Sequence, residues 1–155
     1  MECSSFLASS AFADPSFHGR GFSARLSGST AEFLSIWKLI FIGSNPYFLD
    51  KDGNLAFTLK PAIPAWMFKD DNDSNAADPT YDDEGNFTVT FKLFAHIPVT
   101  YHTPEAIDLF DVAPVSYKVT MKDGSVESIK GAVISSALAD KIRRIWGVTS
   151  IDAYF

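Results

Sequence analysis

A cluster of hydroxyl side chains and one glycine stands at the start of a predicted helix. The segment reads Ser27-Gly28-Ser29-Thr30 and leads into an apolar run. The first amide N–H groups of a helix have no intrahelical acceptor, and the helix dipole places partial positive charge there. Amides, hydroxyls and a flexible glycine together suit an anion, and phosphate above all. The alternative is a helix cap without a ligand, which Ser29 and Glu32 could form at capping-box spacing.

Two side chains shortly before this cluster are a second set of candidates. His18 and Arg20 lie in a loop with Gly19 and Gly21. Both side chains donate hydrogen bonds that phosphate or sugar oxygens accept, and arginine carries a permanent positive charge. One interpretation is that His18 and Arg20 line the same pocket. The other is a surface loop whose glycines make the turns.

Three other features favour structural roles. His96 and His102 are six positions apart without a cysteine or a Glu-x-x-His motif, so we expect structural polar residues and no metal site. Residues 70–84 carry seven carboxylates but lack EF-hand spacing, so we expect a solvated loop. The aromatic side chains are expected in the core, with Trp66, which follows Pro64 closely, as the best candidate for a sugar platform.

Composition places the chain among globular proteins and removes several classes of function. Its 155 residues, 46% hydrophobic and 21% charged, fit one domain or a piece of a larger protein. Residues 70–84 account for the net charge of −6, so the remainder offers no basic surface for nucleic acid. The longest apolar run, residues 39–42, is far too short for a membrane span. The single Cys3 excludes an internal disulfide and is compatible with the cytoplasm.

The element that must position the hydroxyl cluster is a helix predicted over about residues 29–42. Gly43 fits the position just after its end, and Pro46 prevents its continuation. Apolar residues occupy nearly every side of this segment, which is typical of a helix buried all round. The chain contains no second strong helix to cover it, and residues 1–26 show no steady periodicity. We therefore expect a loop over residues 1–26 and a covering partner outside this chain.

From Pro46 onward the pattern is that of β-strands. Apolar and polar residues alternate in three segments, separated by turn sequences such as Asp52-Gly53 and Asp123-Gly124. The alternating segments are residues 54–59, 87–94 and 115–121, and shorter strands are expected at 97–101, 125–129 and 151–155. A short helix is expected over residues 136–144. Short antiparallel strands in this number predict a mainly β fold, and more specifically a β-sandwich.

The order of these features resembles the C-terminal end of cellobiose-phosphorylase-like enzymes, glycoside hydrolase family 94. The matching features are the hydroxyl-glycine cluster, the Trp37-bearing helix, Gly43, the Asp52-Gly53 turn, and the segment Pro61-Ala62-Ile63-Pro64-Ala65-Trp66. The resemblance covers about residues 22–155. It implies that residues 1–45 are the end of a truncated (α/α)6 catalytic barrel, with its last helix, and that residues 46–155 are a C-terminal β-sandwich domain.

The resemblance also implies an activity, the inverting phosphorolysis of β-glucosidic di- or oligosaccharides to a sugar 1-phosphate. Phosphate is a co-substrate, and no cofactor is expected. Ser27, Gly28 and Ser29 would bind the phosphate, and His18 and Arg20 would line the pocket. The family's general acid and its phosphate-binding histidine and arginine lie upstream of such a motif. We therefore assign no catalytic residue here and expect the chain alone to be inactive.

Two hypotheses follow from the sequence. In the first, the chain acts together with the missing part of the barrel, in the cytoplasm, on a β-linked glucosaccharide and phosphate. This hypothesis includes no nucleic acid or membrane partner and allows a homodimer. In the second, it is a non-catalytic β-sandwich that binds carbohydrate or a partner protein. The first predicts an exposed apolar face on the helix, and the second predicts a helix fully covered by the sandwich.

Overall fold

The computed structural model describes residues 5–23, 27–68 and 80–155. The chain divides into two compact units, residues 1–36 and 37–155. The boundary between them falls inside helix α1 (Ser27–Phe41). The fold is mainly β, with α1 and α2 (Ser136–Arg143) as the α-helices of the described residues.

The first unit contains a β-hairpin where the sequence predicted a loop. β1 (Ser5–Leu7) pairs antiparallel with β2 (Gly21–Ser23), and the amide of Ala8 donates to the carbonyl oxygen of Arg20 at 3.0 Å. A 3-10 helix, η1 (Pro15–Phe17), lies in the connection and is capped by the Asp14 carboxylate. The expectation of a loop over residues 1–26 is therefore wrong for both strands. Three-residue strands are too short to produce a readable alternation in sequence.

Helix α1 begins two residues before its predicted start and ends one residue before its predicted end. Because helix α1 begins at Ser27, Ser29 lies within the first turn and not at the N-cap position predicted for it. At the other end the amide of Gly43 donates to the carbonyl oxygen of Lys38 at 2.9 Å, and Gly43 has φ 101°. Gly43 thus ends the helix as predicted.

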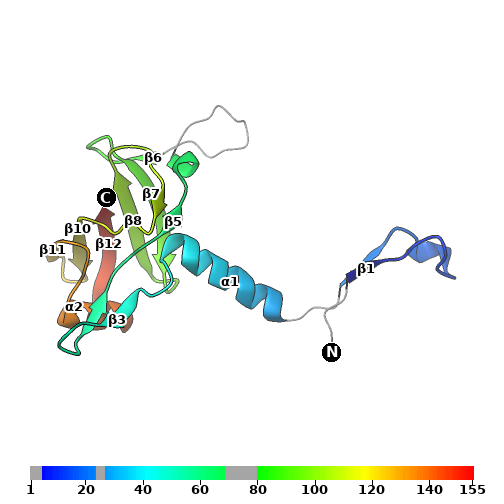
Figure 1. The fold of residues 1–155 in the computed structure, drawn as a ribbon, viewed down its shortest axis with the longest axis horizontal. Coiled ribbons are helices and arrows are strands. Elements are labelled where there is room, and N and C mark those ends of the chain that lie inside the picture. Colours follow the sequence, from blue (N-terminus) through cyan, green and yellow to red (C-terminus); the bar gives the residue numbers. More distant parts are fainter. Residues whose placement is uncertain (1–4, 24–26, 69–79) are drawn as a thin grey trace. The chain divides into compact units, whose positions relative to one another are not determined.

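A six-stranded sheet forms the centre of the second unit (Figure 1). Its strands lie in the order β11-β10-β12-β8-β7-β6, and neighbours are antiparallel except for β12 and β8. The strands are β6 (Thr80–Tyr81), β7 (Phe87–Leu93), β8 (Ile97–Thr103), β10 (Ser116–Met121), β11 (Val126–Lys130) and β12 (Val148–Tyr154). The parallel pair corrects the prediction of antiparallel strands throughout. Alternation reveals a strand and its buried face but not the direction of its neighbour.

Short elements surround the sheet in place of a long second sheet. β3 (Tyr47–Leu49) pairs with β4 (Leu55–Phe57), and β5 (Ala62–Ile63) pairs with β9 (Leu109–Phe110). A further 3-10 helix, η2 (Ala65–Phe68), follows β5. An isolated bridge joins Phe57 to Ile134, just before α2. The core lies among these elements and the sheet, and its large fully buried residues include Phe57, Leu59, Ile63, Tyr101, Tyr117, Ile134, Ile142 and Ile151.

A buried histidine connects the β6–β7 turn to the sheet. On β8, the Nδ1 of His102 lies 2.8 Å from Asp82 Oδ2, and its Nε2 lies 3.0 Å from Asp152 Oδ1 on β12. Both ring nitrogens face carboxylate oxygens, and a ring that carries a proton on each nitrogen can donate a hydrogen bond to both. Asp82 also accepts from the Asn86 amide and side chain at 2.8 Å each. The prediction of a solvated loop is therefore wrong for Asp82; residues 69–79 lie outside the described residues.

Removing the imidazole should destabilise the protein. His102→Ala leaves Asp82 and Asp152 without their shared donor, and leaving such groups unpaired costs about 1–3 kcal/mol. The free energy of unfolding from urea titration measures the loss. His96→Ala is the control, because His96 is exposed and bonds only within its own turn. An equal loss for both variants would contradict the role given to His102.

Asp82 should make the stability fall in acid. Its pKa lies well below the ordinary value because the Asn86 side chain, then backbone amides and His102, donate to its carboxylate. A group whose pKa is lowered on folding stabilises the fold above its unfolded pKa, so this contribution decreases as the pH falls below about 4. In Asp82→Ala, the urea concentration at the midpoint of unfolding should therefore depend less on pH between about 4 and 2 than it does in the wild type. Asp83→Ala, in the same exposed turn, is the matched control, and a wild-type slope for Asp82→Ala would refute the prediction.

Candidate functional site

The predicted phosphate-binding residues occupy the first turn of α1. Ser27, Gly28 and Ser29 all have helical backbone, while their side chains, like residues 24–26 before them, lie outside what the structure describes. The first amides of α1 have no acceptor four residues earlier within the helix. No acidic residue lies in this turn to compete with an anion. The backbone therefore retains the donor end on which the sequence prediction rests.

His18 and Arg20 are engaged inside the β1–β2 hairpin. His18 Nε2 lies 2.8 Å from the carbonyl oxygen of Phe12. The guanidinium of Arg20 stands 5.8 Å from the centre of the Phe17 ring. Their predicted place in one phosphate pocket stays a prediction.

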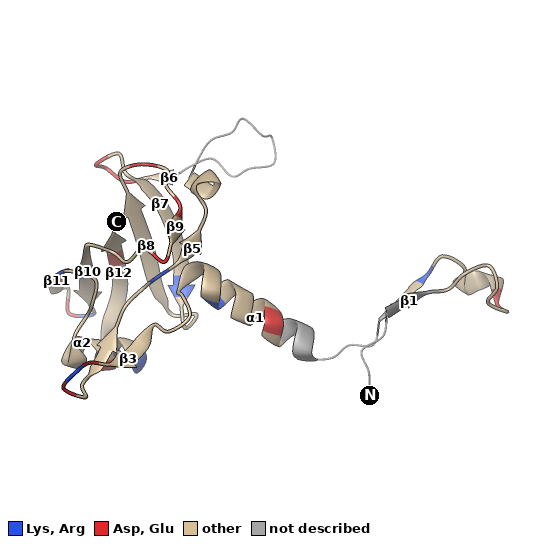
Figure 2. Ribbon diagram, in the orientation of Figure 1, with Lys and Arg blue, Asp and Glu red and all other residues tan. Residues whose placement is uncertain are grey.

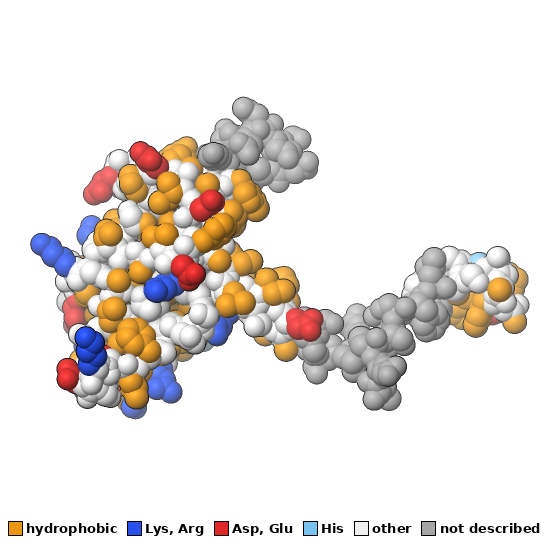
Figure 3. All heavy atoms as spheres, in the orientation of Figure 1, with side chains coloured by type: hydrophobic (Ala, Val, Ile, Leu, Met, Phe, Trp, Pro, Cys, Tyr) orange, Lys and Arg blue, Asp and Glu red, His pale blue; other side chains and the backbone are white. Residues whose placement is uncertain are grey.

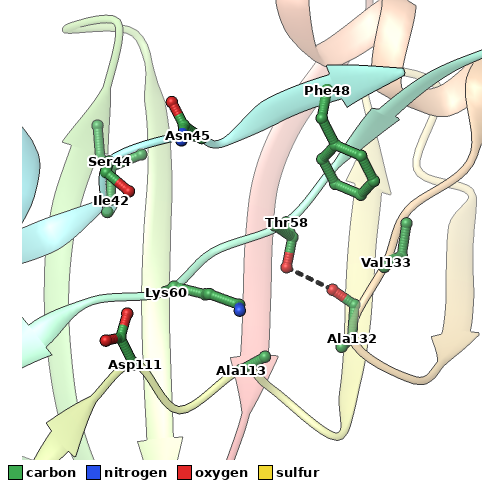
Figure 4. A pocket seen from close by; sticks show the side chains of 11 residues that line it. Ile42, Ser44, Asn45, Phe48, Thr58, Lys60, Asp111, Ala113, Ala132 and Val133 are labelled. Carbon is green, nitrogen blue, oxygen red and sulfur yellow. Dashed lines mark hydrogen bonds between the residues drawn. The ribbon is translucent and has the colours of Figure 1, made fainter. Parts of the chain in front are cut away.

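A groove that the sequence analysis did not predict lies in the second unit. A hollow of about 490 Å³ is bordered by the segment after α1, by β3, and by residues near positions 58–60, 111–113 and 132–133 (Figure 4). A second hollow of about 340 Å³ shares Gly43, Ser44, Lys60 and Asp111 with it. The shared lining makes the two hollows one continuous feature, here called the Lys60 groove.

Besides Thr58, four polar side chains surround the main hollow. Figure 4 shows the amino group of Lys60 with the carboxylate of Asp111, the amide of Asn45 and the hydroxyl of Ser44 around the same space. Within the described part of the chain none of these four side chains has a hydrogen bond or ion pair to another residue. The ring of Phe48, which is 39% exposed, stands on another side. The groove thus offers free donors, free acceptors and an aromatic surface.

The floor of the groove is held by buried hydrogen bonds. Thr58 Oγ1 donates to the carbonyl oxygen of Ala132 at 2.7 Å, and the Tyr117 hydroxyl donates to the same oxygen at 3.1 Å. The Tyr117 oxygen in turn accepts from the Leu59 amide at 3.2 Å. Burial raises the pKa of Tyr117, so the hydroxyl remains a donor at neutral pH. These bonds connect segments far apart in sequence before any ligand arrives.

Backbone geometry fixes two further positions in the lining. A Cβ at residue 43 would stand 2.4 Å from the carbonyl oxygen of Lys60, so this close approach requires Gly43. Asp111 has φ 55°, in the left-handed region that aspartate adopts more readily than most residues. The backbone therefore holds both residues in unusual conformations beside the hollow. A non-glycine residue in this region, such as Asp111, is typical of binding sites.

The sequence contained no signal for the groove. Asn45, Lys60 and Asp111 are single polar residues in different segments, and no spacing motif relates them. Trp66, the aromatic residue singled out from sequence as a sugar platform, lies exposed in η2 and does not line the groove. The structure places Phe48 there instead.

The described residues form neither a metal site nor a membrane-spanning helix. Among residues 5–23, 27–68 and 80–155, no group of three His, Cys, Asp or Glu side chains is placed to hold a metal ion. Neither described helix has the length and apolar character needed to cross a bilayer. Lys and Arg residues are distributed over several elements rather than along one face of an element (Figure 2).

Removing the hydroxyl group should affect stability differently at Tyr117, which is hydrogen-bonded in the groove floor, and at Tyr47, which is not hydrogen-bonded to any described residue. Tyr117→Phe leaves the buried Leu59 amide without an acceptor and should lower the free energy of unfolding by about 1–3 kcal/mol. Tyr47→Phe removes a buried hydroxyl that has no partner among the described residues, so it should leave stability unchanged or raise it by up to about 1 kcal/mol. Urea titration measures both. Equal losses would show that the Tyr117 bonds contribute nothing beyond packing.

Comparison with known proteins identifies no family, since no family model, curated protein or solved structure matches this chain.

Proposed function

We propose that this chain is the C-terminal part of an inverting glycoside phosphorylase of the cellobiose-phosphorylase type. The enzyme would act on β-glucosidic di- or oligosaccharides and phosphate in the cytoplasm and release a sugar 1-phosphate. In this proposal the first turn of α1, with Ser27, Gly28 and Ser29, is one wall of the phosphate site. Residues 1–45 are the end of the (α/α)6 barrel, and residues 46–155 are the β-sandwich domain.

The observation that carries the proposal is the exposed apolar surface of α1. Phe33, Leu34, Ile36 and Leu39 are 65%, 60%, 54% and 45% exposed. Figure 3 shows hydrophobic side chains, in orange, on the surface over the described part of α1. Burying one such side chain fully stabilises a protein by about 1.5–3 kcal/mol, so an uncovered face of this size favours a partner. The rest of the helix is anchored, because Trp37, Ile40 and Phe41 pack on the core of the second unit. The remainder of the catalytic barrel is the partner we propose.

The chemistry of phosphorolysis suits a helix start. Phosphate attacks the anomeric carbon as the glycosidic C–O bond breaks, and a carboxylic acid gives its proton to the leaving sugar oxygen. The attacking dianion must be held beside a developing positive charge on the sugar. Amide donors at a helix start hold it with only partial positive charge. The acid itself is not assigned to this chain, so the chain alone should have no activity.

A non-catalytic binding module is the second candidate, and the Lys60 groove is the observation in its favour. That candidate expects the helix to be covered by the sandwich. Leu39 belongs to the second unit and is still 45% exposed, which favours the first candidate. A homodimer is compatible with either one.

Phosphate kinetics test the proposal in the longest protein encoded by the reading frame that contains this chain. With cellobiose and phosphate this protein should release glucose 1-phosphate, and the 155-residue chain alone should not. Ser27→Ala should raise the KM for phosphate about tenfold or more, the effect expected from losing a hydrogen bond to a charged group. Gly28→Ala keeps its backbone amide but adds a methyl group where the backbone must approach the phosphate closely, so it should also raise this KM. Ser35→Ala, exposed on the same helix, is the control.

Two results would overturn this proposal. One is an unchanged KM for phosphate in both first-turn variants of an active enzyme. The other is a reading frame that encodes no (α/α)6 barrel with a carboxylic acid positioned for catalysis.

A further inference from the structure

We propose that the Lys60 groove binds an uncharged saccharide about two sugar units long. The groove shares no residue with the first turn of α1, where the phosphate site was proposed. Leu39, one of the exposed apolar residues of α1, lines its smaller hollow. All of its lining residues belong to the second unit.

The charges around the hollow favour a neutral ligand. Lys60 and Asp111 carry opposite charges and face the same space (Figure 4). An anion drawn to Lys60 would meet the Asp111 carboxylate, and a cation drawn to Asp111 would meet the Lys60 amino group. A hydroxyl group suits both, because it accepts from the amino group and donates to the carboxylate. Hydrogen bonds of this kind to charged side chains are stronger than bonds between neutral groups.

The remaining lining supplies the other contacts that a sugar needs. Asn45 offers both a donor and an acceptor, and Ser44 offers a hydroxyl, so neighbouring hydroxyl groups on one ring could be paired. The exposed ring of Phe48 presents an apolar surface against which the C–H face of a sugar ring can lie. Ala113 and Val133 complete the apolar side. Apolar walls with a few convergent polar groups are typical of small-molecule sites.

The size and continuity of the groove indicate the length of the ligand. The hollows of about 490 and 340 Å³ both fall within the range of small-molecule pockets, which is roughly 300–1,000 Å³. Lys60 and Asp111 line both hollows, so they stand where the two meet. A disaccharide with one ring in each hollow would place its linkage beside these two side chains.

The groove is also organised before binding. Besides the bonds of Thr58 and Tyr117, the Lys60 amide donates to the Ile42 carbonyl oxygen at 3.1 Å, and the Thr58 amide donates to that of Pro46 at 2.9 Å. Hydrogen bonds therefore join three of the lining segments, at residues 42–46, 58–60 and 132. A preformed site loses less conformational entropy on binding, which matters for a small polar ligand.

Nuclear magnetic resonance of the whole 155-residue chain tests this inference with cellobiose as the probe. Titration should shift the backbone amide signals of Gly43, Asn45, Lys60, Asp111 and Val133. Glucose should shift the same signals with an affinity several-fold weaker, because it fills only one hollow. Asn45→Ala and Lys60→Met should each weaken cellobiose binding about tenfold, the effect of losing one hydrogen bond. Lys92→Met, an exposed lysine on β7, should bind as the wild type does.

Three outcomes would overturn the inference. They are the absence of shifts at millimolar cellobiose, shifts centred on Trp66 or Trp146 instead, and shifts of the groove amides by inorganic phosphate but not by cellobiose. The test is separable from that of the phosphorylase. Groove binding without phosphorolysis by the longer protein refutes only the proposed function, and phosphorolysis without groove binding refutes only this inference.

Discussion

The end of helix α1 meets the rest of the second unit through a backbone contact that only glycine allows. At Gly43 the chain takes φ 101°, and a Cβ would stand 2.4 Å from the carbonyl oxygen of Lys60. The hydrogen bond from the Lys60 amide to Ile42 fixes the same two segments. The direction in which the chain leaves the helix follows from this contact. So does the position of Asn45 beside the Lys60 groove, two residues later.

Different chemistry lies on the two sides of this contact. On the side of the helix, the rings of Trp37 and Phe41 pack against Phe91, with centroid distances of 5.8 and 5.4 Å, and the Tyr101 hydroxyl donates to the carbonyl oxygen of Phe41. On the other side, the polar side chains of the Lys60 groove other than Thr58 have no partners among the described residues. The aromatic cluster supplies rigidity, which leaves the groove side chains available for a ligand. The side chains that stabilise the end of the helix and the side chains available for a ligand thus belong to different residues, only a few positions apart.

The proposed sites lie at opposite ends of one helix and depend on different physics. The first turn of α1 offers backbone amides and the positive end of a dipole, which suit a phosphate. The segment after its last turn offers side chains of both charges, which suit hydroxyl groups.

Local patterns in the sequence determined much of this protein. The alternation of residues 87–94 and 115–121, and Gly43 followed by Pro46, predicted two strands and the end of α1, because periodicity and turn residues act over a few positions. Only the tertiary structure decided the parallel pairing of β12 with β8 and the bonds of Asp82 to His102. It alone brought Lys60 and Asp111 to one hollow. These contacts join residues separated by 20 to 52 positions, and no local preference encodes which distant segments become neighbours.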